Sequence, residues 1–417
     1  MSALNGAAFG SCRRKTRCMN SIAAVGLATS LLLAVGCGGG SSAPQVSTIT
    51  TTGNNVLDIQ VNSGPAGVYA NGAFASATVC TPGTSNCQTI DGLLVDTGSS
   101  GLRILSSALT ASLPQQKASD GNPVVECVPF VSGYTWGPVQ TADLQLGSEK
   151  AGSVPVQVLS DSDFPVPSRC ANSGPSMNSL SALGANGILG VGVFAQDCGG
   201  ACVSTGASNP ALYYECPASG CVVVGESLSE QVPNPVALFS ADNNGVIIEL
   251  PAASAPASSA NGSLIFGIGT QSNNALGSAK VYTVDDFGNF ITIYNNQTYN
   301  GSFIDSGSNG LYFLTSNTTG IPVCPDANFF YCPPSTESLS ATTAGAGGSP
   351  TSTVNFSVAN ADSLFDNNPN ATVFEDLAGP NTLAGFDWGL PFFYGRNVFT
   401  AIEGKTTPGG TGPYWAY

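Results

Sequence analysis

Two aspartates lie in closely similar ten-residue segments, one in each half of the chain. Residues 93–102 read LLVDTGSSGL around Asp96, and residues 302–311 read SFIDSGSNGL around Asp305. In each segment a mostly apolar run, typical of a strand, leads the aspartate into a turn built from a hydroxyl residue and glycine. If the two turns meet, carboxyls that close cannot both ionise, so they share one proton. The ionised carboxyl can then activate water while the protonated one donates to a carbonyl oxygen, which together would hydrolyse a peptide bond.

The sequence contains no histidine, and this excludes several classes of enzyme site. A Ser-His-Asp triad, a Cys-His pair and an HExxH zinc site all need that residue. The formal net charge of −15 argues against nucleic acid as a partner, because phosphate binding requires lysine and arginine. Two carboxylates could also serve a glycosidase, in which they lie about 5–9.5 Å apart. Nothing else in the sequence favours a sugar substrate, and we expect no cofactor and no metal.

The elements that must hold the two turns are predicted to be strands. The chain of 417 residues has 51 glycines, 27 prolines and only 9% charged residues. Short apolar or alternating runs separated by Gly, Pro and Asn are typical of β-barrels and sandwiches. The length and the doubled motif predict an all-β protein of two related lobes. We place the N-terminal lobe at residues 55–240 and the C-terminal lobe at residues 241–417.

Three further segments, residues 187–192 (GILGVG), 261–267 (NGSLIFG) and 388–400 (WGLPFFYGRNVFT), occur in a fixed order around the aspartate motifs. With those motifs, the chain resembles the pepsin-like aspartic peptidases, and more specifically a bacterial lipoprotein branch of that clan. The resemblance implies a bilobal double β-barrel with an active-site cleft between the lobes. It also implies an aspartic endopeptidase, a hydrolase that cleaves polypeptide substrates at acidic pH.

The resemblance assigns a role to each residue of the two aspartate loops. Asp96 and Asp305 match the catalytic aspartates. The hydroxyls three residues further on match groups that hydrogen-bond each aspartate. The hydroxyls directly after the aspartates match a pair that grips across the lobes. The supporting loop residues are thus Thr97, Gly98, Ser99, Ser306, Gly307 and Ser308.

A tyrosine on a hairpin flap is a further feature that the resemblance implies. Tyr134, in residues 134–137 (YTWG) before residues 143–147 (DLQLG), is the candidate. The spacing is shorter than in the family. In the alternative interpretation Trp136 is a core aromatic.

Four positions depart from the family pattern. Pro391 stands where the family usually has glycine, and Phe392 stands where an aspartate is common. We expect these changes to alter the support beneath the Asp305 loop. Gly101 and Gly310 stand where the family carries bulkier residues, and we expect them to widen the site.

The N-terminal sequence is predicted to direct export. A basic cluster at residues 13–17 precedes an apolar run at residues 22–35, which is the layout of a secretory signal peptide. Small residues before Cys37 and a Gly/Ser stretch after it resemble the lipobox of bacterial lipoproteins. We expect a lipoprotein signal peptide over residues 1–36, lipidation of Cys37 and a flexible tether over residues 37–54. The alternative is an ordinary signal peptide with an incidental cysteine.

These features predict a lipid-anchored monomer in a bacterial cell envelope, in the periplasm or at the outer membrane. Thirteen cysteines fit such an oxidising compartment. The predicted disulfides join Cys80 to Cys87, Cys324 to Cys332 and Cys127 to Cys170. The remaining Cys198, Cys202, Cys216 and Cys221 either pair among themselves or bind zinc.

Two other functions remain open at this level. A pepsin-fold protein that binds ligands without catalysis would keep the fold and lose the activity. A structural or adhesive surface lipoprotein would explain the disulfides and the Gly/Ser/Thr-rich loops, but it would leave the doubled aspartate motif unexplained.

Overall fold

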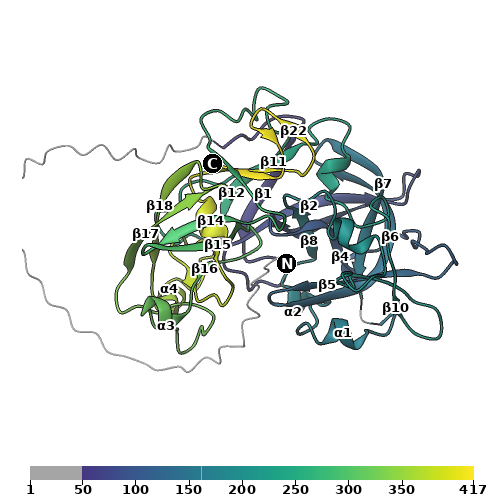
Figure 1. The fold of residues 1–417 in the computed structure, drawn as a ribbon, viewed down its shortest axis with the longest axis horizontal. Helices are drawn as coiled ribbons and strands as arrows, with labels where there is room; N and C mark the ends of the chain where they lie inside the picture. The colour runs from purple at the N-terminus through teal and green to yellow at the C-terminus, as the bar shows by residue number, and fades with distance from the viewer. Residues whose placement is uncertain (1–48, 161) are drawn as a thin grey trace, which may run out of the picture.

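The computed structural model describes residues 49–160 and 162–417 (Figure 1). The predicted signal peptide, Cys37 and most of the tether lie outside the described residues. Within the described part, helices are short: the longest α-helix is α4 (Ala361–Asn367). The other helices are α1 (Ser168–Ala171), α2 (Leu180–Leu183), α3 (Ser316–Thr319) and the 3₁₀ helices η1 (Ser106–Ala108), η2 (Gly199–Cys202), η3 (Pro235–Leu238) and η4 (Leu390–Phe393).

The largest sheet has fifteen strands, and part of it closes on itself. Strands β2, β3, β8, β4, β7 and β6 pair in that order, and β6 also pairs with β2, so they form a closed barrel. The strands of this half are β1 (Val56–Asn62), β2 (Gly72–Cys80), β3 (Cys87–Asp96), β4 (Ser100–Leu105), β5 (Val124–Phe130), β6 (Gly133–Leu146), β7 (Glu149–Leu159), β8 (Gly187–Val191), β9 (Tyr213–Glu215) and β10 (Val222–Val223).

The same sheet continues into the second half of the chain. Strand β1 pairs with β12, and β11, β21, β24 and β13 follow in order. Figure 1 shows β1, β11 and β12 between the strands of the two halves. The bounds are β11 (Gly245–Glu249), β12 (Ala260–Phe266), β13 (Val281–Thr283), β21 (Asn397–Ala401) and β24 (Tyr414–Ala416). Because strands on both sides of residue 240 share this sheet, the predicted lobe boundary stays a prediction.

A seven-stranded sheet forms the rest of the second half, in the order β18-β17-β14-β15-β20-β16-β19. Its strands are β14 (Phe290–Tyr294), β15 (Gln297–Ile304), β16 (Leu311–Phe313), β17 (Glu337–Ala344), β18 (Thr351–Val358), β19 (Ala378–Gly379) and β20 (Phe386–Trp388). A separate hairpin pairs β22 (Thr406–Thr407) with β23 (Gly410–Thr411). The chain therefore has the all-β, bilobal, pepsin-like double-barrel fold that the sequence predicted.

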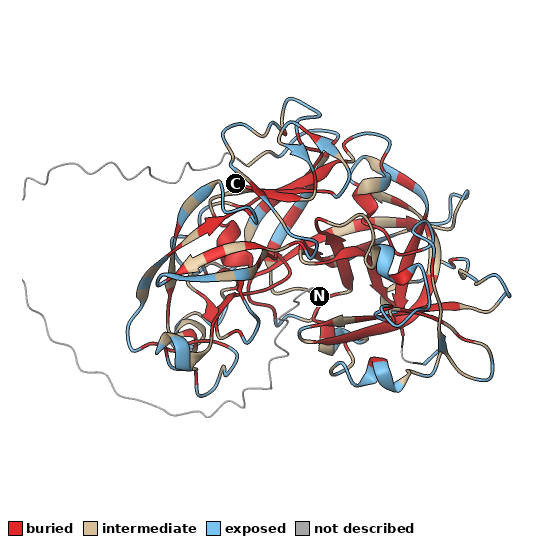
Figure 2. Ribbon diagram, in the orientation of Figure 1, coloured by how far each residue is buried: buried red, intermediate tan, exposed pale blue. Residues whose placement is uncertain are grey.

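Burial follows the strands, as Figure 2 shows. In β1 the apolar Leu57, Ile59 and Val61 are buried, while Asp58 and Gln60 between them are exposed. This alternation is the pattern of a strand with one face on the core. All six residues of β4, by contrast, are buried, because this strand lies inside the sheet directly after the first aspartate loop.

The same local topology positions both aspartate loops. Strand β3 runs parallel to β8, and β4 returns antiparallel on the other side of β8. Strand β15 likewise runs parallel to β20, with β16 antiparallel to it. Asp96 is the last residue of β3, and Asp305 directly follows β15. The two halves are therefore duplicated at the site as well as in sequence.

Residues 49–160 and 162–417 contain five disulfides, which include the three predicted pairs. Cysteines 198, 202, 216 and 221 are all oxidised, so the zinc alternative for them is wrong, because a bonded cysteine offers no thiolate. No helix among the described residues is long and apolar enough to span a membrane. The bonds join Cys80 to Cys87, Cys127 to Cys170, Cys198 to Cys202, Cys216 to Cys221 and Cys324 to Cys332.

Candidate active site

The two aspartate loops are joined by reciprocal hydrogen bonds. The Thr97 hydroxyl donates to the carbonyl oxygen of Ile304 (3.1 Å) and accepts from the backbone N–H of Ser306 (2.9 Å). The Ser306 hydroxyl donates to the carbonyl oxygen of Val95 (2.8 Å) and accepts from the N–H of Thr97 (3.1 Å). These four buried bonds relate the loops by an approximate twofold axis. They form the cross-lobe contact expected of Thr97 and Ser306.

The loop glycines bind the aspartates and leave room for them to meet. The N–H of Gly98 donates to Asp96 Oδ1 and the N–H of Gly307 donates to Asp305 Oδ1, both at 2.8 Å. A Cβ atom at Gly98 would lie 2.6 Å from Cγ of Asp305, which is closer than a Cβ atom comes to any non-bonded atom. Glycine is needed there because the opposite carboxyl lies directly against the backbone.

The carboxyls of Asp96 and Asp305 hydrogen-bond each other, and both are fully buried. Burial raises the pKa of Asp96, while hydrogen bonds from Asp305 and Ser99 act in the opposite direction. Burial and then the negative charge of Asp96 hold the pKa of Asp305 well above its usual range. Two carboxyls this close cannot both ionise, so the pair shares one proton.

The serine three residues after each aspartate behaves differently in the two halves. Ser99 donates its hydroxyl proton to Asp96 Oδ2. The hydroxyl oxygen of Ser308 lies 3.1 Å from Asp305 Oδ2 and also 2.7 Å from Oδ2 of Asp387. Asp387 is a buried third carboxyl on β20 that the sequence analysis missed. The sequence does contain a signal for Asp387, since it is an acidic residue next to a tryptophan in an otherwise apolar segment.

The segment beneath the Asp305 loop contacts it through Gly389 and Leu390. A Cβ at Gly389 would lie 2.0 Å from the carbonyl oxygen of Gly310, so this close crossing requires glycine at 389. The N–H of Leu390 donates to the carbonyl of Ser308 at 2.7 Å. Proline has no N–H, but the residue before it supplies this bond. This contact does not depend on residue 391 or 392, so the expected effect of Pro391 and Phe392 on the support stays a prediction.

Gly101 and Gly310 do not widen the site. A Cβ at Gly101 would lie 2.5 Å from Cγ1 of Val232, and a Cβ at Gly310 would lie 3.3 Å from the rings of Phe330 and Tyr312. Neighbouring side chains fill the space that bulkier residues would need. This expectation is wrong because sequence alone does not show which distant residues pack against a glycine.

A buried ion-pair network lies beside the Asp96 loop. Arg103 Nη2 lies 3.2 Å from Glu126 Oε1 and 3.1 Å from Asp197 Oδ2, and Nη1 donates to the carbonyl of Ser100 at 2.7 Å. All three charged side chains are buried. The positive charge of Arg103 also lowers the pKa of Asp96, after the larger effects of burial and hydrogen bonding. Arg103 thus favours the ionised form of Asp96. Its position inside the apolar strand β4 was the signal for it in the sequence.

Tyr69, which the sequence analysis did not single out, lies near the aspartate pair. After burial, the negative charges of Asp96 and Asp305 raise the pKa of its phenol. Its ring packs edge-on against Phe74, with centroids 5.4 Å apart. Asn71, two residues further on, donates from Nδ2 to the carbonyl of Phe374 in the other half at 2.8 Å. The loop between β1 and β2 therefore crosses to the second half beside the aspartates.

Tyr134, the flap candidate, lies near the start of β6 in a buried cluster. This cluster contains Trp136, Tyr214 and the Cys127–Cys170 disulfide. The indole N–H of Trp136 donates to the carbonyl oxygen of Phe164 at 3.0 Å, and the ring is fully buried. These contacts support the core interpretation of Trp136. The flap role of Tyr134 stays a prediction.

The aspartate pair lies just beneath the molecular surface. The exposed fraction of both Asp96 and Asp305 is 0%, while Gly98 next to them is partly exposed. A cavity of about 930 Å³ along β1 and β2 includes neither aspartate. The predicted active-site cleft between the lobes therefore stays a prediction.

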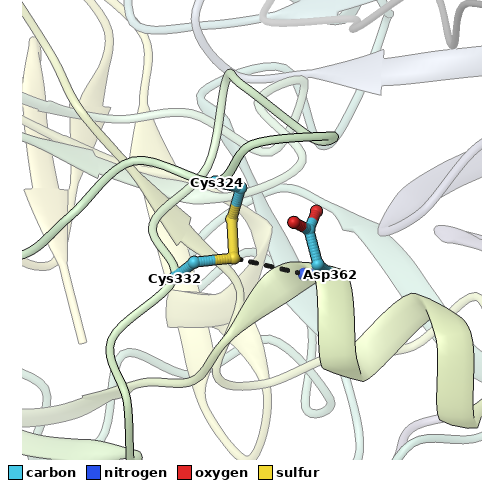
Figure 3. A group of neighbouring side chains, drawn as sticks. All are labelled: Cys324, Cys332 and Asp362. Carbon is cyan, nitrogen blue, oxygen red and sulfur yellow. Dashed lines mark hydrogen bonds between the residues drawn. A yellow bond between two sulfur atoms is a disulfide. The ribbon is translucent and has the colours of Figure 1, made fainter.

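A group of potential metal ligands, Cys324, Cys332 and Asp362, lies outside this site (Figure 3). Its cysteines form a disulfide, and the backbone N–H of Asp362 lies 3.5 Å from Cys332 Sγ. Oxidised cysteines cannot supply thiolate ligands, so the group does not fit a metal site.

Comparisons with known proteins place the chain in a family. The family model described as "Protein of unknown function (DUF3443)" matches residues 51–417. The chain belongs to the DUF3443 family. It is also similar to the crystal structure of an aspartic proteinase from Irpex lacteus, with 15% sequence identity, coverage of 87% of this chain and 96% of that one, and a TM-score of 0.47. That score is too low to support a functional argument. No curated protein matches the sequence.

Proposed function

We propose that the protein is an aspartic endopeptidase in which Asp96 and Asp305 activate water together. The observation that carries the proposal is the buried, mutually hydrogen-bonded carboxyl pair. The Thr97 and Ser306 hydroxyls hold the two loops together from both sides. Such a pair performs acid and base catalysis without histidine.

The two carboxyls have different roles in the proposed reaction. Ionised Asp96 takes a proton from a water molecule as its oxygen attacks the peptide carbonyl carbon. Asp305 donates its proton to the carbonyl oxygen, and a tetrahedral diol forms. The proton on Asp96 then passes to the amide nitrogen as the C–N bond breaks. Asp305 recovers its proton from the collapsing diol, so the pair returns to its starting state.

The proposed reaction proceeds only while the aspartate pair carries one shared proton. Both carboxyls have a raised pKa, with burial as the largest cause, so we expect the singly protonated state to extend to higher pH than for exposed aspartates. Activity is expected to fall on the acid side when Asp96 is protonated and on the alkaline side when the pair loses its proton.

The spacing of the carboxyls favours a peptidase over a glycosidase. Glycosidase carboxyls lie about 5–9.5 Å apart to accommodate a sugar carbon and a water. The side chains of Asp96 and Asp305 instead form a hydrogen bond with each other. This contact is suited to sharing a proton.

We further propose that the protein acts on polypeptides outside the cytoplasm as a lipid-anchored monomer. The five disulfides support an oxidising compartment. The proposed anchor at Cys37 lies outside the described residues, so its support comes from the sequence alone.

The experiment is a peptide-library digest between pH 3 and 7, with cut sites read by mass spectrometry. The wild type is expected to cut peptides in a pattern blocked by a statine-type inhibitor, which mimics the tetrahedral intermediate. Asp96→Asn should cut none of these sites. Asp242→Asn is a matched control, because Asp242 is buried and hydrogen-bonded to Thr270 and Gln271.

A binding protein without catalytic activity is the second candidate, and the complete burial of both aspartates favours it. Under this alternative, the wild type would bind the statine-type inhibitor but leave every peptide of the library intact.

A further inference from the structure

A third carboxyl lies directly behind Asp305. Asp387 is the central residue of β20 and has an exposed fraction of 1%. It stands opposite Phe303 of β15 and opposite Tyr312 of β16. It therefore lies inside the sheet that carries the Asp305 loop.

The duplicated half of the protein places an apolar residue at the same point. In the first half, Leu94 of β3 pairs with Ile188 of β8, and the next residue, Val95, pairs with Leu189. In the other half, Phe303 of β15 pairs with Asp387 in the corresponding position. Ile188 is fully buried and belongs to the apolar core. The fold accepts a hydrocarbon side chain at this position, so architecture does not explain the carboxyl at 387.

Ser308 connects this carboxyl to the proposed active site. Its hydroxyl oxygen lies 2.7 Å from Asp387 Oδ2 and 3.1 Å from Asp305 Oδ2. A serine hydroxyl has one proton, so it can donate to only one carboxyl at a time. The second contact is a hydrogen bond only when the other carboxyl supplies a proton. The protonation state of Asp387 therefore determines which carboxyl receives the Ser308 proton.

No cation compensates Asp387 in the described part of the chain. Both ion pairs found there belong to Arg103 in the other half. Oδ1 of Asp387 is buried and has no hydrogen-bond partner among the described residues. The titratable groups that interact with Asp387 are Asp305, Asp96 and the phenol of Tyr312. Burial and the negative charge of Asp96 disfavour ionisation of Asp387, while the hydrogen bond from Ser308 favours it.

We propose that Asp387 is a positioning residue that acts through Ser308 and sets the alkaline limit of the active aspartate pair. This inference rests on the proposed function of Asp96 and Asp305. While Asp387 is protonated, it donates to Ser308, and the Ser308 proton points to Asp305. Once Asp387 ionises, Ser308 turns to it, and the new negative charge holds the shared proton on the pair. The pair then stays singly protonated to higher pH than it would with a neutral residue at position 387.

The test compares pH profiles of kcat/KM for the wild type and Asp387→Asn. Asparagine keeps the size and can still donate to Ser308, but it cannot ionise. We expect the alkaline limb to move down by about one pH unit, the size expected when one neighbouring charge is removed. In the Ser308→Ala background, Asp387→Asn should shift the limb less, since the connecting hydroxyl is absent. The Asp242→Asn profile should coincide with that of the wild type.

A readout independent of peptidase activity separates this inference from the proposed function. Titration of ¹³C-labelled aspartate carboxyls by NMR follows Asp305 directly, and the melting temperature confirms that the variant folds. The Asp305 titration should move to lower pH in Asp387→Asn. An unmoved Asp305 titration in a folded variant overturns the inference, whether or not the enzyme is active. Absence of cleavage by the wild type contradicts the proposed function and leaves the NMR result to decide the role of Asp387.

Discussion

Thr97 and Ser306 exchange hydrogen bonds across the two halves of the protein, each accepting from the backbone N–H of the other, at 2.9 and 3.1 Å. Each hydroxyl also donates to a carbonyl that precedes the opposite aspartate. The contact is buried, so its loss would leave N–H and carbonyl groups without partners. It therefore fixes the distance between the two carboxyls as well as holding the halves together.

Thr97→Val tests this contact, because valine has the shape of threonine without its hydroxyl. We expect the free energy of unfolding to fall by about 1–3 kcal/mol, the cost of unsatisfied buried polar groups. Urea unfolding followed by circular dichroism measures the change. Thr97→Ser keeps the hydroxyl and should lose distinctly less stability. Equal losses in the two variants would show that the hydroxyl does not contribute.

Removing Arg103 should affect both stability and the acid limit of activity. Arg103→Met leaves Glu126 and Asp197 buried without their cation, which costs about 3–5 kcal/mol. Arg103 lowers the pKa of Asp96, so its removal should raise that pKa and move the acid limb of kcat/KM to higher pH. Arg103→Lys keeps the charge and should retain the position of the acid limb better. A methionine variant that folds with an unmoved acid limb would contradict the electrostatic role.

Stability should decrease as pH rises toward neutrality, and Glu226 contributes to this. Burial, followed by the charges of Glu230 and Glu215, raises the pKa of Glu226 from 4.5 to about 7. A group whose pKa is higher in the folded state stabilises that state below its unfolded pKa. This contribution is lost as pH rises through the folded value. The melting temperature should therefore fall between about pH 4.5 and 7, and the fall should be smaller in Glu226→Gln. Parallel curves for variant and wild type would exclude this contribution.

The features that repeat or lie close in sequence were predictable. The doubled motif predicted that Asp96 and Asp305 meet, and short spacing predicted the Cys80–Cys87 and Cys324–Cys332 bonds. The missed groups depend on packing between distant strands. The role of Arg103 becomes apparent only from its ion pair with Glu126 on β5.

Asp387 and Pro391 illustrate the same limit of sequence reasoning. Asp387 becomes relevant only because the pairing of β15 with β20 brings it to Ser308. The contacts beneath the Asp305 loop are made by the N–H of Leu390 and by the close approach of Gly389 to Gly310, which the motif comparison at Pro391 did not indicate. Periodicity and motif spacing do not report such contacts, since they depend on strand register in three dimensions.

The most direct test of the central claim is the rate of hydrolysis of a single-site peptide by the wild type, Asp96→Asn, Asp305→Asn and Asp242→Asn. The shared-proton mechanism predicts that kcat falls at least about 100-fold in each of the first two variants, because each loses one partner in proton transfer. The Asp242→Asn variant should match the wild type. Equal rates for the wild type, Asp96→Asn and Asp305→Asn would contradict the account.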